Sequence, residues 1–399
     1  MKRKLVVLLI AILAIGLAAC SGGSALECTD EIGCVEVGPD EAIKIASALV
    51  ITGPDAQLGL DSQYGVEIAI EFKGDVLGHS VELQPEDDGC NAEGGQAVAQ
   101  KVVADPQIVG MIGTSCSGAG VPASEVLAEN GYAMISPSNT APVLTDPETH
   151  QATYLRTAHN DKVQGRAMAE YAINELGVTQ AAAIHDGDPY TEGLASVFRD
   201  AFEELGGTIV AFEAVDKNAD DVTPVLTTVA AAGPPELIYY PVFTNLGANI
   251  TKQAKEVAGL DGVVLAAADG VQSPDFLEAA GDASEGMYVS GPDLSFANET
   301  YDRLLETYQT NYGTEPLSVF HAHAFDATTM LLNAIEAVAQ EADDGTLLIG
   351  RQALLDELFA TSGYNGVTGT LTCDEYGDCA DPQIAVSQVQ NGEFTAIWP

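Results

Sequence analysis

Apolar residues recur in two kinds of pattern along the chain from residue 43 onward. Short runs dominated by apolar and small residues, such as 43–49 (IKIASAL), 108–113 (IVGMIG) and 133–136 (AMIS), could each form a buried strand. Loops and stretches of about 10–15 residues with helical spacing of apolar positions separate these runs. The repeated order of strand, loop and helix predicts an α/β protein built from βαβ units with parallel sheets.

The alternation occurs in two series. Five strands with their helices fit between Ile43 and Leu155, and a second series begins after Thr157. Two series favour two α/β lobes over one oversized sheet. Further expected elements are strands at 181–185, 208–212, 237–240, 263–266 and 286–292, helices at 298–312 and 318–340, and a β-hairpin over 369–389 closed by Cys373 and Cys379.

The first twenty residues have the pattern of a secretory signal. A basic segment, Lys2-Arg3-Lys4, precedes an apolar run over 5–16 and the small-residue sequence Leu17-Ala18-Ala19-Cys20. The apolar run is shorter than the ~18 residues expected of a membrane-spanning helix, which disfavours an uncleaved anchor. The ending resembles the bacterial lipobox, which implies that Cys20 becomes the lipidated first residue of the mature chain. Residues 21–41 contain Gly22-Gly23-Ser24 and no periodic pattern, so we expect a flexible tether.

Six cysteines remain after Cys20 is set aside. An even number in an oxidising compartment indicates disulfides, and six cysteines allow 15 pairings. Spacing along the chain favours three of these pairs: Cys28–Cys34, Cys90–Cys116 and Cys373–Cys379. A zinc site is the alternative, but the chain has no Cys-x-x-Cys pair, and we expect no metal.

The charge is strongly one-sided. Lys and Arg number 15 against 59 Asp and Glu, which gives a formal net charge of −44. Such a field repels nucleic acid and anionic membrane surfaces, so neither is expected as a partner.

Two predicted strands end in small, hydroxyl-bearing loops at the start of new helices. One loop is Ser115-Cys116-Ser117-Gly118, and the other is Ser136-Pro137-Ser138-Asn139-Thr140. In a parallel sheet such loops lie side by side at the carboxyl edge, where their free N–H groups and helix dipoles favour an anion. We therefore expect the stretch 87–142 to bind the carboxylate of a small ligand. Ser and Thr are also favoured as simple helix caps, which is the competing explanation.

Catalytic and dinucleotide motifs find little support. Gly118 to Ala123 matches G-x-G-x-x-A, but Pro122 interrupts it and the strand ending at Ser136 supplies no acidic residue for a ribose. The chain has no G-x-S-x-G, and its histidines are scattered. We predict that the protein is not an enzyme and needs no cofactor.

The order of several short stretches resembles a known family. They are 49–59 (LVITGPDAQLG), 87–90, 112–117, 135–142, 155–165 (LRTAHNDKVQG), 184–193 (IHDGDPYTEG), Tyr239-Tyr240 and 283–289 (ASEGMYV). Together they resemble the type I periplasmic binding proteins that serve branched-chain amino acid ABC transporters. The resemblance implies two Rossmann-like lobes in a Venus-flytrap arrangement, with three crossovers near Thr157, near 290–292 and beyond Gly369. Lobe 1 would comprise 42–157 plus 293–370, and lobe 2 would comprise 158–292 plus 371–399.

The resemblance also assigns roles to single residues. It implies that Ser117 and Thr140 bind the carboxylate of an amino acid, that the Ser138 carbonyl accepts from its ammonium, that Asp269 pairs with the ammonium, and that Tyr190 closes from the second lobe. Leu58, Phe243 and Phe320 would form the apolar wall, and Cys90 would be the disulfide partner of Cys116.

The implied function is capture of a small aliphatic or branched-chain amino acid outside the cytoplasm. A monomeric, lipid-anchored protein on the outer face of the bacterial cell membrane or in the periplasm would deliver it to permease subunits driven by cytoplasmic ATPases. An amide, urea or aromatic acid as ligand, or a sensing role for a signalling receptor, remains the alternative.

Overall fold

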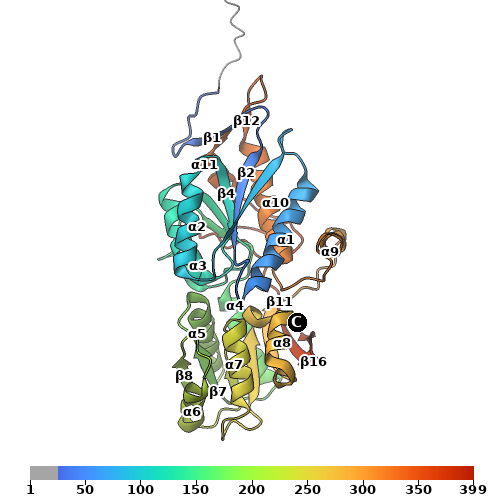
Figure 1. Cartoon of the computed structure of the whole chain (residues 1–399). Coiled ribbons are helices and arrows are strands. Elements are labelled where there is room, and N and C mark those ends of the chain that lie inside the picture. The colour runs from blue at the N-terminus through green and yellow to red at the C-terminus, as the bar shows by residue number, and fades with distance from the viewer. Residues whose placement is uncertain (1–25) are drawn as a thin grey trace, which may run out of the picture.

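Two sheets, each with helices on both faces, form two lobes stacked end to end (Figure 1). The computed structural model describes residues 26–399, so the predicted signal segment and Cys20 lie outside the described residues. The first lobe has a five-stranded sheet in the order β3-β2-β4-β5-β6, and the second has seven strands in the order β17-β16-β11-β10-β9-β7-β8. The predicted α/β, two-lobed fold is confirmed.

The first lobe is built from five parallel strands. These are β2 (Ile43–Leu49), β3 (Val81–Asp87), β4 (Ile108–Gly113), β5 (Ala133–Ser136) and β6 (Tyr154–Arg156), linked through α1 (Ala56–Lys73), α2 (Ala92–Ala104), α3 (Ser117–Glu129) and the short helix η1 (Pro142–Leu144). Alternate residues of β2 face opposite sides: Ile43 and Ile45 pack with residues of α10, whereas Ala46 and Ala48 pack with α2 and α3. Burial on both faces explains why the inner strands β4 and β5 read as continuous apolar runs, whereas the partly exposed edge strand β3 (VELQPED) does not.

The second lobe continues the same alternation. Its elements are α4 (Asp161–Asn174), β7 (Gln180–His185), α5 (Pro189–Glu204), β8 (Thr208–Ala214), α6 (Thr223–Ala232), β9 (Leu237–Tyr239), α7 (Thr244–Ala254), β10 (Val264–Ala268), η2 (Asp269–Val271), α8 (Pro274–Ala280), η3 (Gly281–Ser284) and β11 (Tyr288–Pro292). Strands β7 to β11 are parallel. The lobe is completed from the end of the chain by β16 (Ile384–Gln390), antiparallel to β11, and by β17 (Glu393–Trp398).

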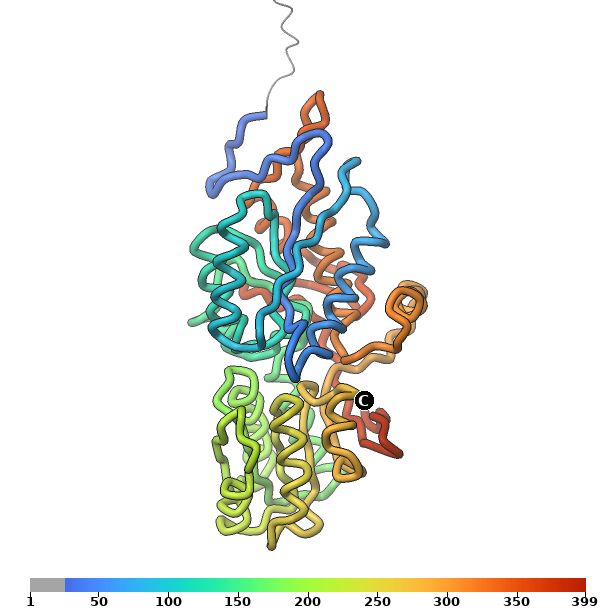
Figure 2. Tube along the Cα trace, in the orientation of Figure 1, coloured from blue at the N-terminus to red at the C-terminus, as the bar shows by residue number. Residues whose placement is uncertain are grey.

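Between β11 and β16 the chain returns to the first lobe. This segment contains α9 (Glu299–Tyr312), α10 (His321–Val338), β12 (Gln340–Glu341), β13 (Leu347–Gly350), α11 (Arg351–Phe359), β14 (Tyr364–Asn365) and β15 (Thr370–Leu371). In Figure 2 the upper lobe therefore combines blue, teal and orange segments, while the lower lobe combines green and yellow segments with the red C-terminus. Within the described residues, no helix is both long and apolar enough to cross a membrane.

The structure corrects two predictions. The expected hairpin over 369–389 is wrong, because β15 pairs with β14, whereas β16 pairs with β11 and β17. The actual hairpin turns at Asn391-Gly392, where both residues have positive φ as a tight two-residue turn requires. The predicted tether also contains strand β1 (Cys34–Val37), which pairs with β13 and buries Val35 and Val37. Four residues are too few for the sequence to show the alternation of buried and exposed positions that is typical of a strand.

All three cysteine pairings favoured by spacing are present. The disulfides are Cys28–Cys34, Cys90–Cys116 and Cys373–Cys379.

One buried carboxylate ties α1 to the segment that opens α10. Asp61 lies within α1 and is fully buried. Its Oδ1 accepts from the Tyr308 hydroxyl and the Leu317 N–H at 3.0 Å each, and its Oδ2 accepts from the N–H groups of Phe320 and His321 at 2.9 and 2.8 Å. His321 Nδ1 also lies 3.1 Å from Oδ2. Since Phe320 is the N-cap residue of α10 and cannot cap it, Asp61 supplies the acceptor that this helix end needs.

Replacing Asp61 by Ala should therefore lower the free energy of unfolding by about 3–5 kcal/mol, because several buried donors lose their acceptor together. Urea denaturation at neutral pH measures this change. Glu129→Ala, at an exposed position at the end of α3, is the control and should change stability by less than about 0.5 kcal/mol. Equal stability of the Asp61 and Glu129 variants would contradict the assignment.

Candidate functional site

The carboxyl ends of the parallel strands in the two sheets face each other where the lobes meet, a boundary called the cleft below (Figure 1). The two predicted hydroxyl-bearing loops lie on its first-lobe side. The loops after β4 and β5 are adjacent because these strands pair in parallel. Ser138 Oγ donates to the Ser115 carbonyl at 2.9 Å, and Ser117 Oγ accepts from the Ala141 N–H at 3.2 Å. The predicted side-by-side arrangement is confirmed.

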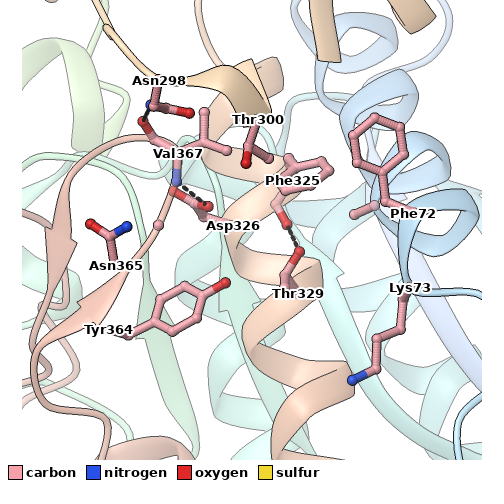
Figure 3. Close-up of a pocket in the computed structure, with 12 residues that line it drawn as sticks. Phe72, Lys73, Asn298, Thr300, Phe325, Asp326, Thr329, Tyr364, Asn365 and Val367 are labelled. Carbon is pink, nitrogen blue, oxygen red and sulfur yellow. Dashed lines mark hydrogen bonds between the residues drawn. The ribbon is translucent and has the colours of Figure 1, made fainter. Parts of the chain in front are cut away.

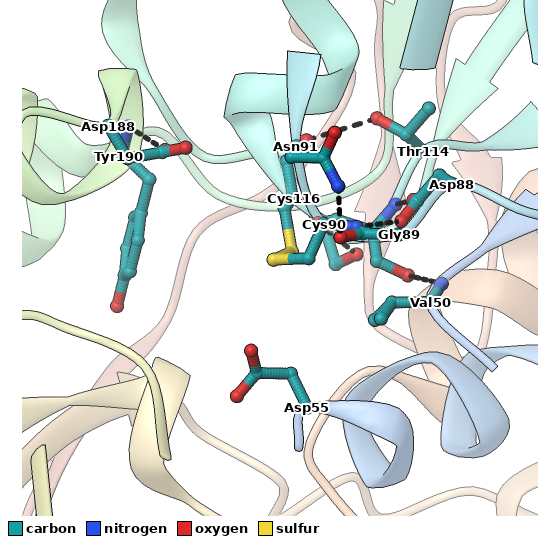
Figure 4. Close-up of a disulfide and its surroundings, with 12 residues drawn as sticks. Val50, Asp55, Asp88, Gly89, Cys90, Asn91, Thr114, Cys116, Asp188 and Tyr190 are labelled. Atoms are coloured by element: carbon teal, nitrogen blue, oxygen red, sulfur yellow. Dashed lines mark hydrogen bonds between the residues drawn. A yellow bond between two sulfur atoms is a disulfide. The ribbon is translucent and has the colours of Figure 1, made fainter. Parts of the chain in front are cut away.

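A second buried carboxylate shapes the loop that carries Ser117. Asp88 accepts from the N–H groups of Cys90 and Ser115 at 2.8 and 2.6 Å, and the Cys90–Cys116 disulfide closes the same loop (Figure 4). Burial raises the pKa of Asp88 to about 7, against the effect of these two donors. The disulfide and the carboxylate together restrict the backbone from which Ser117 projects.

Arg156 stabilises the loop that carries Thr140. Its guanidinium is fully buried, and Nη1 donates to the carbonyls of Asn139 and Ala141 at 3.2 and 2.9 Å, on either side of Thr140. Asp378, in the loop closed by the third disulfide, pairs with Arg156. The Thr140 backbone is therefore held by an ion pair that comes from distant parts of the chain.

Asp269 lies opposite these loops, directly after β10. Its Oδ1 accepts from Gln164 Nε2 at 2.6 Å and from the Tyr190 hydroxyl at 3.3 Å. The Tyr190 oxygen in turn accepts from the Gly270 N–H at 3.2 Å. Burial raises the pKa of Asp269, while His159 and Gln164 oppose the rise. The predicted pair Tyr190 and Asp269 thus meets within the second lobe.

Asp161 completes the polar site, and no role was predicted for it. Its backbone N–H donates to the Thr140 carbonyl at 3.0 Å. Among the described residues, neither its carboxylate oxygens nor Thr140 Oγ1 form a hydrogen bond of standard geometry, although all three atoms are buried. The Thr140 hydroxyl is still close enough to favour the ionised carboxylate. Burial and then the charge of Asp269 raise the pKa of Asp161 well above its usual value.

The stretch 155–165 contained the signal for Asp161 and Gln164. It begins within β6 and continues into the first turn of α4, and the carboxyl end of β6 lies beside that of β5. At the first-lobe edge the prediction assigned polar ligand contacts only to the two hydroxyl-bearing loops, and from the second lobe it named Tyr190 and Asp269. Asp161 and Gln164, in the first turn of α4, therefore received no role.

The predicted apolar residues come together next to the disulfide. Leu58 and Phe320 belong to one buried cluster, and half-buried Phe243 packs against it. The Phe243 ring also lies 5.2 Å from the Tyr190 ring, measured between centroids. The other buried members of this cluster are Val50, Cys90, Cys116, Ala158 and Val319.

A separate cavity of about 300 Å³ lies on the first lobe between α1, α10 and the segment after β14 (Figure 3). Its buried acid, Asp326, is fully engaged: Oδ1 accepts from the Val367 N–H, and Oδ2 accepts from the Thr368 N–H and hydroxyl, at 2.7–2.8 Å. Both carboxylate oxygens of Asp326 thus have backbone or hydroxyl donors, unlike those of Asp161 in the cleft. Over residues 26–399, no group of three or more His, Cys, Asp or Glu side chains is arranged to hold a metal ion.

Comparison with known proteins agrees with this geometry. A family model described as periplasmic binding protein matches residues 42–393. The leucine-, isoleucine-, valine-, threonine- and alanine-binding protein of Pseudomonas aeruginosa is 30% identical over 341 residues, covering 85% of this chain and 87% of the relative. The leucine-binding protein LivK of Thermotoga maritima superposes with a TM-score of 0.80 at 28% identity, covering 89% of this chain and 98% of that one.

A third relative was solved with an amino acid. The ABC transporter substrate-binding protein of Desulfitobacterium hafniense in complex with Leu superposes with a TM-score of 0.71 at 26% identity, covering 90% of this chain and 100% of that one. The family model and these relatives span nearly the whole two-lobed fold. The chain belongs to the type I periplasmic binding proteins, a family of solute-binding proteins rather than enzymes.

Proposed function

We propose that this protein captures an aliphatic α-amino acid in the cleft and delivers it to the permease of an ABC transporter. The observation that carries the proposal is a set of hydroxyl and N–H donors near two buried carboxylates, and neither oxygen of one of them, Asp161, forms a hydrogen bond of standard geometry among the described residues. A zwitterion needs donors at one end and anionic acceptors about one amino-acid backbone away.

The donors suit the ligand carboxylate. Ser117 is the first residue of α3, and Thr140 precedes η1 with a buried hydroxyl that has no partner of standard geometry in residues 26–399. Hydrogen bonds to an ionised acceptor are shorter and about twice as strong as neutral ones. The helix N-terminus adds a favourable partial charge.

The carboxylates suit the ligand ammonium. Asp161 and Asp269 are both buried, and they lie close enough together for the charge of Asp269 to raise the pKa of Asp161. An uncompensated buried charge is costly, and a cation bound between two such acids removes much of that cost. Ligands without an ammonium group, such as simple aromatic acids, would leave it in place.

The apolar cluster suits an aliphatic side chain. Leu58, Phe243 and Phe320 provide carbon surface beside the polar groups. The ligands named for the relatives, which include leucine, isoleucine and valine, support the same ligand class. In this proposal the two lobes close on one ligand, and the chain acts as a monomer.

The location follows from the family and from the sequence. Periplasmic binding proteins work outside the cytoplasm, and the segment ending at Cys20 supports attachment through lipid on that cysteine.

Isothermal titration calorimetry should detect L-leucine binding. At 100 times the dissociation constant, the ligand should raise the free energy of unfolding by about 2.7 kcal/mol.

Two matched ligands separate the contributions of the charged ends. The first, 4-methylpentanoate, lacks the ammonium, and the second, 3-methylbutylamine, lacks the carboxylate. Both should bind far more weakly than L-leucine. Asp269→Ala should weaken leucine binding by about 2–5 kcal/mol. Preferential binding of the ammonium-free acid would overturn the proposal.

Leucine binding should also release protons. The ligand ammonium favours ionised Asp161, whose pKa is raised in the free protein, so binding lowers this pKa and expels the proton that the acid holds. Affinity should therefore rise with pH across the range in which Asp161 titrates. Calorimetry in phosphate and in Tris at the same pH measures the released protons from the difference in heat. Asp161→Asn should abolish the release, and an unchanged release in this variant would exclude Asp161 as the source.

Replacing Cys20 by Ser should move the protein from the membrane fraction to the soluble fraction of cells, because the thioether for the lipid is lost. Immunoblotting of the two fractions measures the shift, with Ser21→Ala as the control. Retention of the Cys20 variant in the membrane fraction would contradict lipid anchoring at this residue.

A further inference from the structure

Two helices that open onto the cleft lack a side-chain cap of their own. The N-cap residue of α3 is the disulfide-bonded Cys116 and that of α7 is Phe243, and neither side chain makes a capping hydrogen bond. Helix N-termini leave N–H groups without partners and carry a positive partial charge. Each of these two ends is met by a carboxylate from the opposite lobe.

Asp188 of the second lobe reaches α3 of the first. It is the N-cap residue of α5, and its Oδ1 accepts from the Tyr190 N–H at 2.9 Å. The N–H of Gly118, the second residue of α3, also stabilises the ionised Asp188 carboxylate. The approach is so close that a Cβ at Gly118 would lie 1.9 Å from Asp188 Oδ2. One carboxylate thus sits between the N-termini of helices from both lobes.

Asp55 of the first lobe makes the reciprocal contact. It occupies the N-cap position of α1 but forms no capping bond there. Instead its Oδ1 accepts from the N–H of Thr244, the first residue of α7, at 3.2 Å. The Asp55 side chain therefore caps α7 of the second lobe and not α1, the helix that it precedes.

Lys217 makes a third contact between the lobes. It lies in the segment between β8 and α6, and its Nζ donates to the Cys90 carbonyl of the first lobe at 3.3 Å. Its charge favours the ionised forms of both Asp55 and Asp188, although burial is the larger effect and raises the pKa of each. Figure 4 shows Asp188 beside Tyr190 on one side of the Cys90–Cys116 disulfide and Asp55 on another.

We infer that Asp55, Asp188 and Lys217 form an interlobe latch that determines how long the lobes stay closed. The helix ends α3, α5 and α7 carry like partial charges and repel when the lobes meet, and the carboxylates between them turn this repulsion into attraction. The latch adjoins the proposed ligand contacts, because Gly118 follows Ser117 and Asp188 lies two residues before Tyr190. The inference rests on the proposed function only for the choice of L-leucine as probe.

Two variants test the latch at pH 7.5, where Asp188 is ionised because its pKa is about 6. Asp188→Ser keeps a good N-cap for α5 but loses the charge and the reach to α3. Asp55→Ala removes the bond to Thr244 and no capping bond of α1. Each variant should raise the dissociation rate of L-leucine about tenfold, which corresponds to about 1.4 kcal/mol. The association rate should change less than twofold, because the ligand enters the open form; surface plasmon resonance measures both rates.

The matched control is Glu204→Gln. Glu204 is the last residue of α5, the helix whose N-cap residue is Asp188. Its side chain is 65% exposed and pairs with Arg166 away from the cleft. Both rates should stay at the wild-type values. Unchanged dissociation from the Asp188 and Asp55 variants would overturn the latch, as would tighter leucine binding by Asp188→Ser, which would show that this carboxylate competes with the ligand.

Amide hydrogen exchange tests the latch without any ligand. Asp188→Ser should accelerate exchange at the Thr244 N–H, which Asp188 does not cap, because closure forms both contacts together. Normal exchange at this amide in Asp188→Ser would overturn the latch. If the wild-type protein does not bind L-leucine but this exchange does accelerate, the proposed ligand fails and the latch stands.

Discussion

The cleft is governed by one electrostatic constraint: helix N-termini from both lobes converge on it. In a parallel sheet every helix that follows a strand begins at the carboxyl edge, and here the carboxyl edges of two sheets face each other. Positive partial charges therefore accumulate from both sides. Closure without anionic groups between these ends would be unfavourable, so a ligand carboxylate and the protein's own acids are natural components of the closed form.

The buried acids of this protein fall into two physical classes. Asp61 and Asp88 have both oxygens engaged by N–H or hydroxyl donors, and they hold α10 and the disulfide loop in place. Asp161 has buried oxygens that no described residue engages with standard geometry, and it lies in the cleft. Satisfied acids of the first class stabilise the backbone, whereas an acid of the second class is stable only with a proton or a cation. A strongly acidic composition thus serves the fold and the site in different ways.

The sequence predicted the features that depend on local pattern. Short apolar runs identified the strands, and Ser117 and Thr140 were recognisable at strand ends. Cysteine spacing indicated all three disulfides. The missed features depend on distant partners. Gln164 meets Asp269 across 105 residues, so neither side chain shows its partner locally. Likewise, β1 is a strand only because β13 covers it, and β16 pairs with the distant β11 as well as with the adjacent β17.

The position of β16 has a consequence for how the chain acquires its structure. This strand covers the edge of β11, yet the whole return segment through the first lobe separates the two in sequence. During synthesis from the N-terminus, β11 has an unpaired edge until residues 384–390 emerge, and such an edge invites pairing with other chains. The second lobe therefore cannot reach its final form before the first lobe has received its last helices. Maturation of the two lobes is interleaved, and a chain that ends before β16 contains every strand of the first lobe but leaves the edge of β11 in the second lobe unpaired.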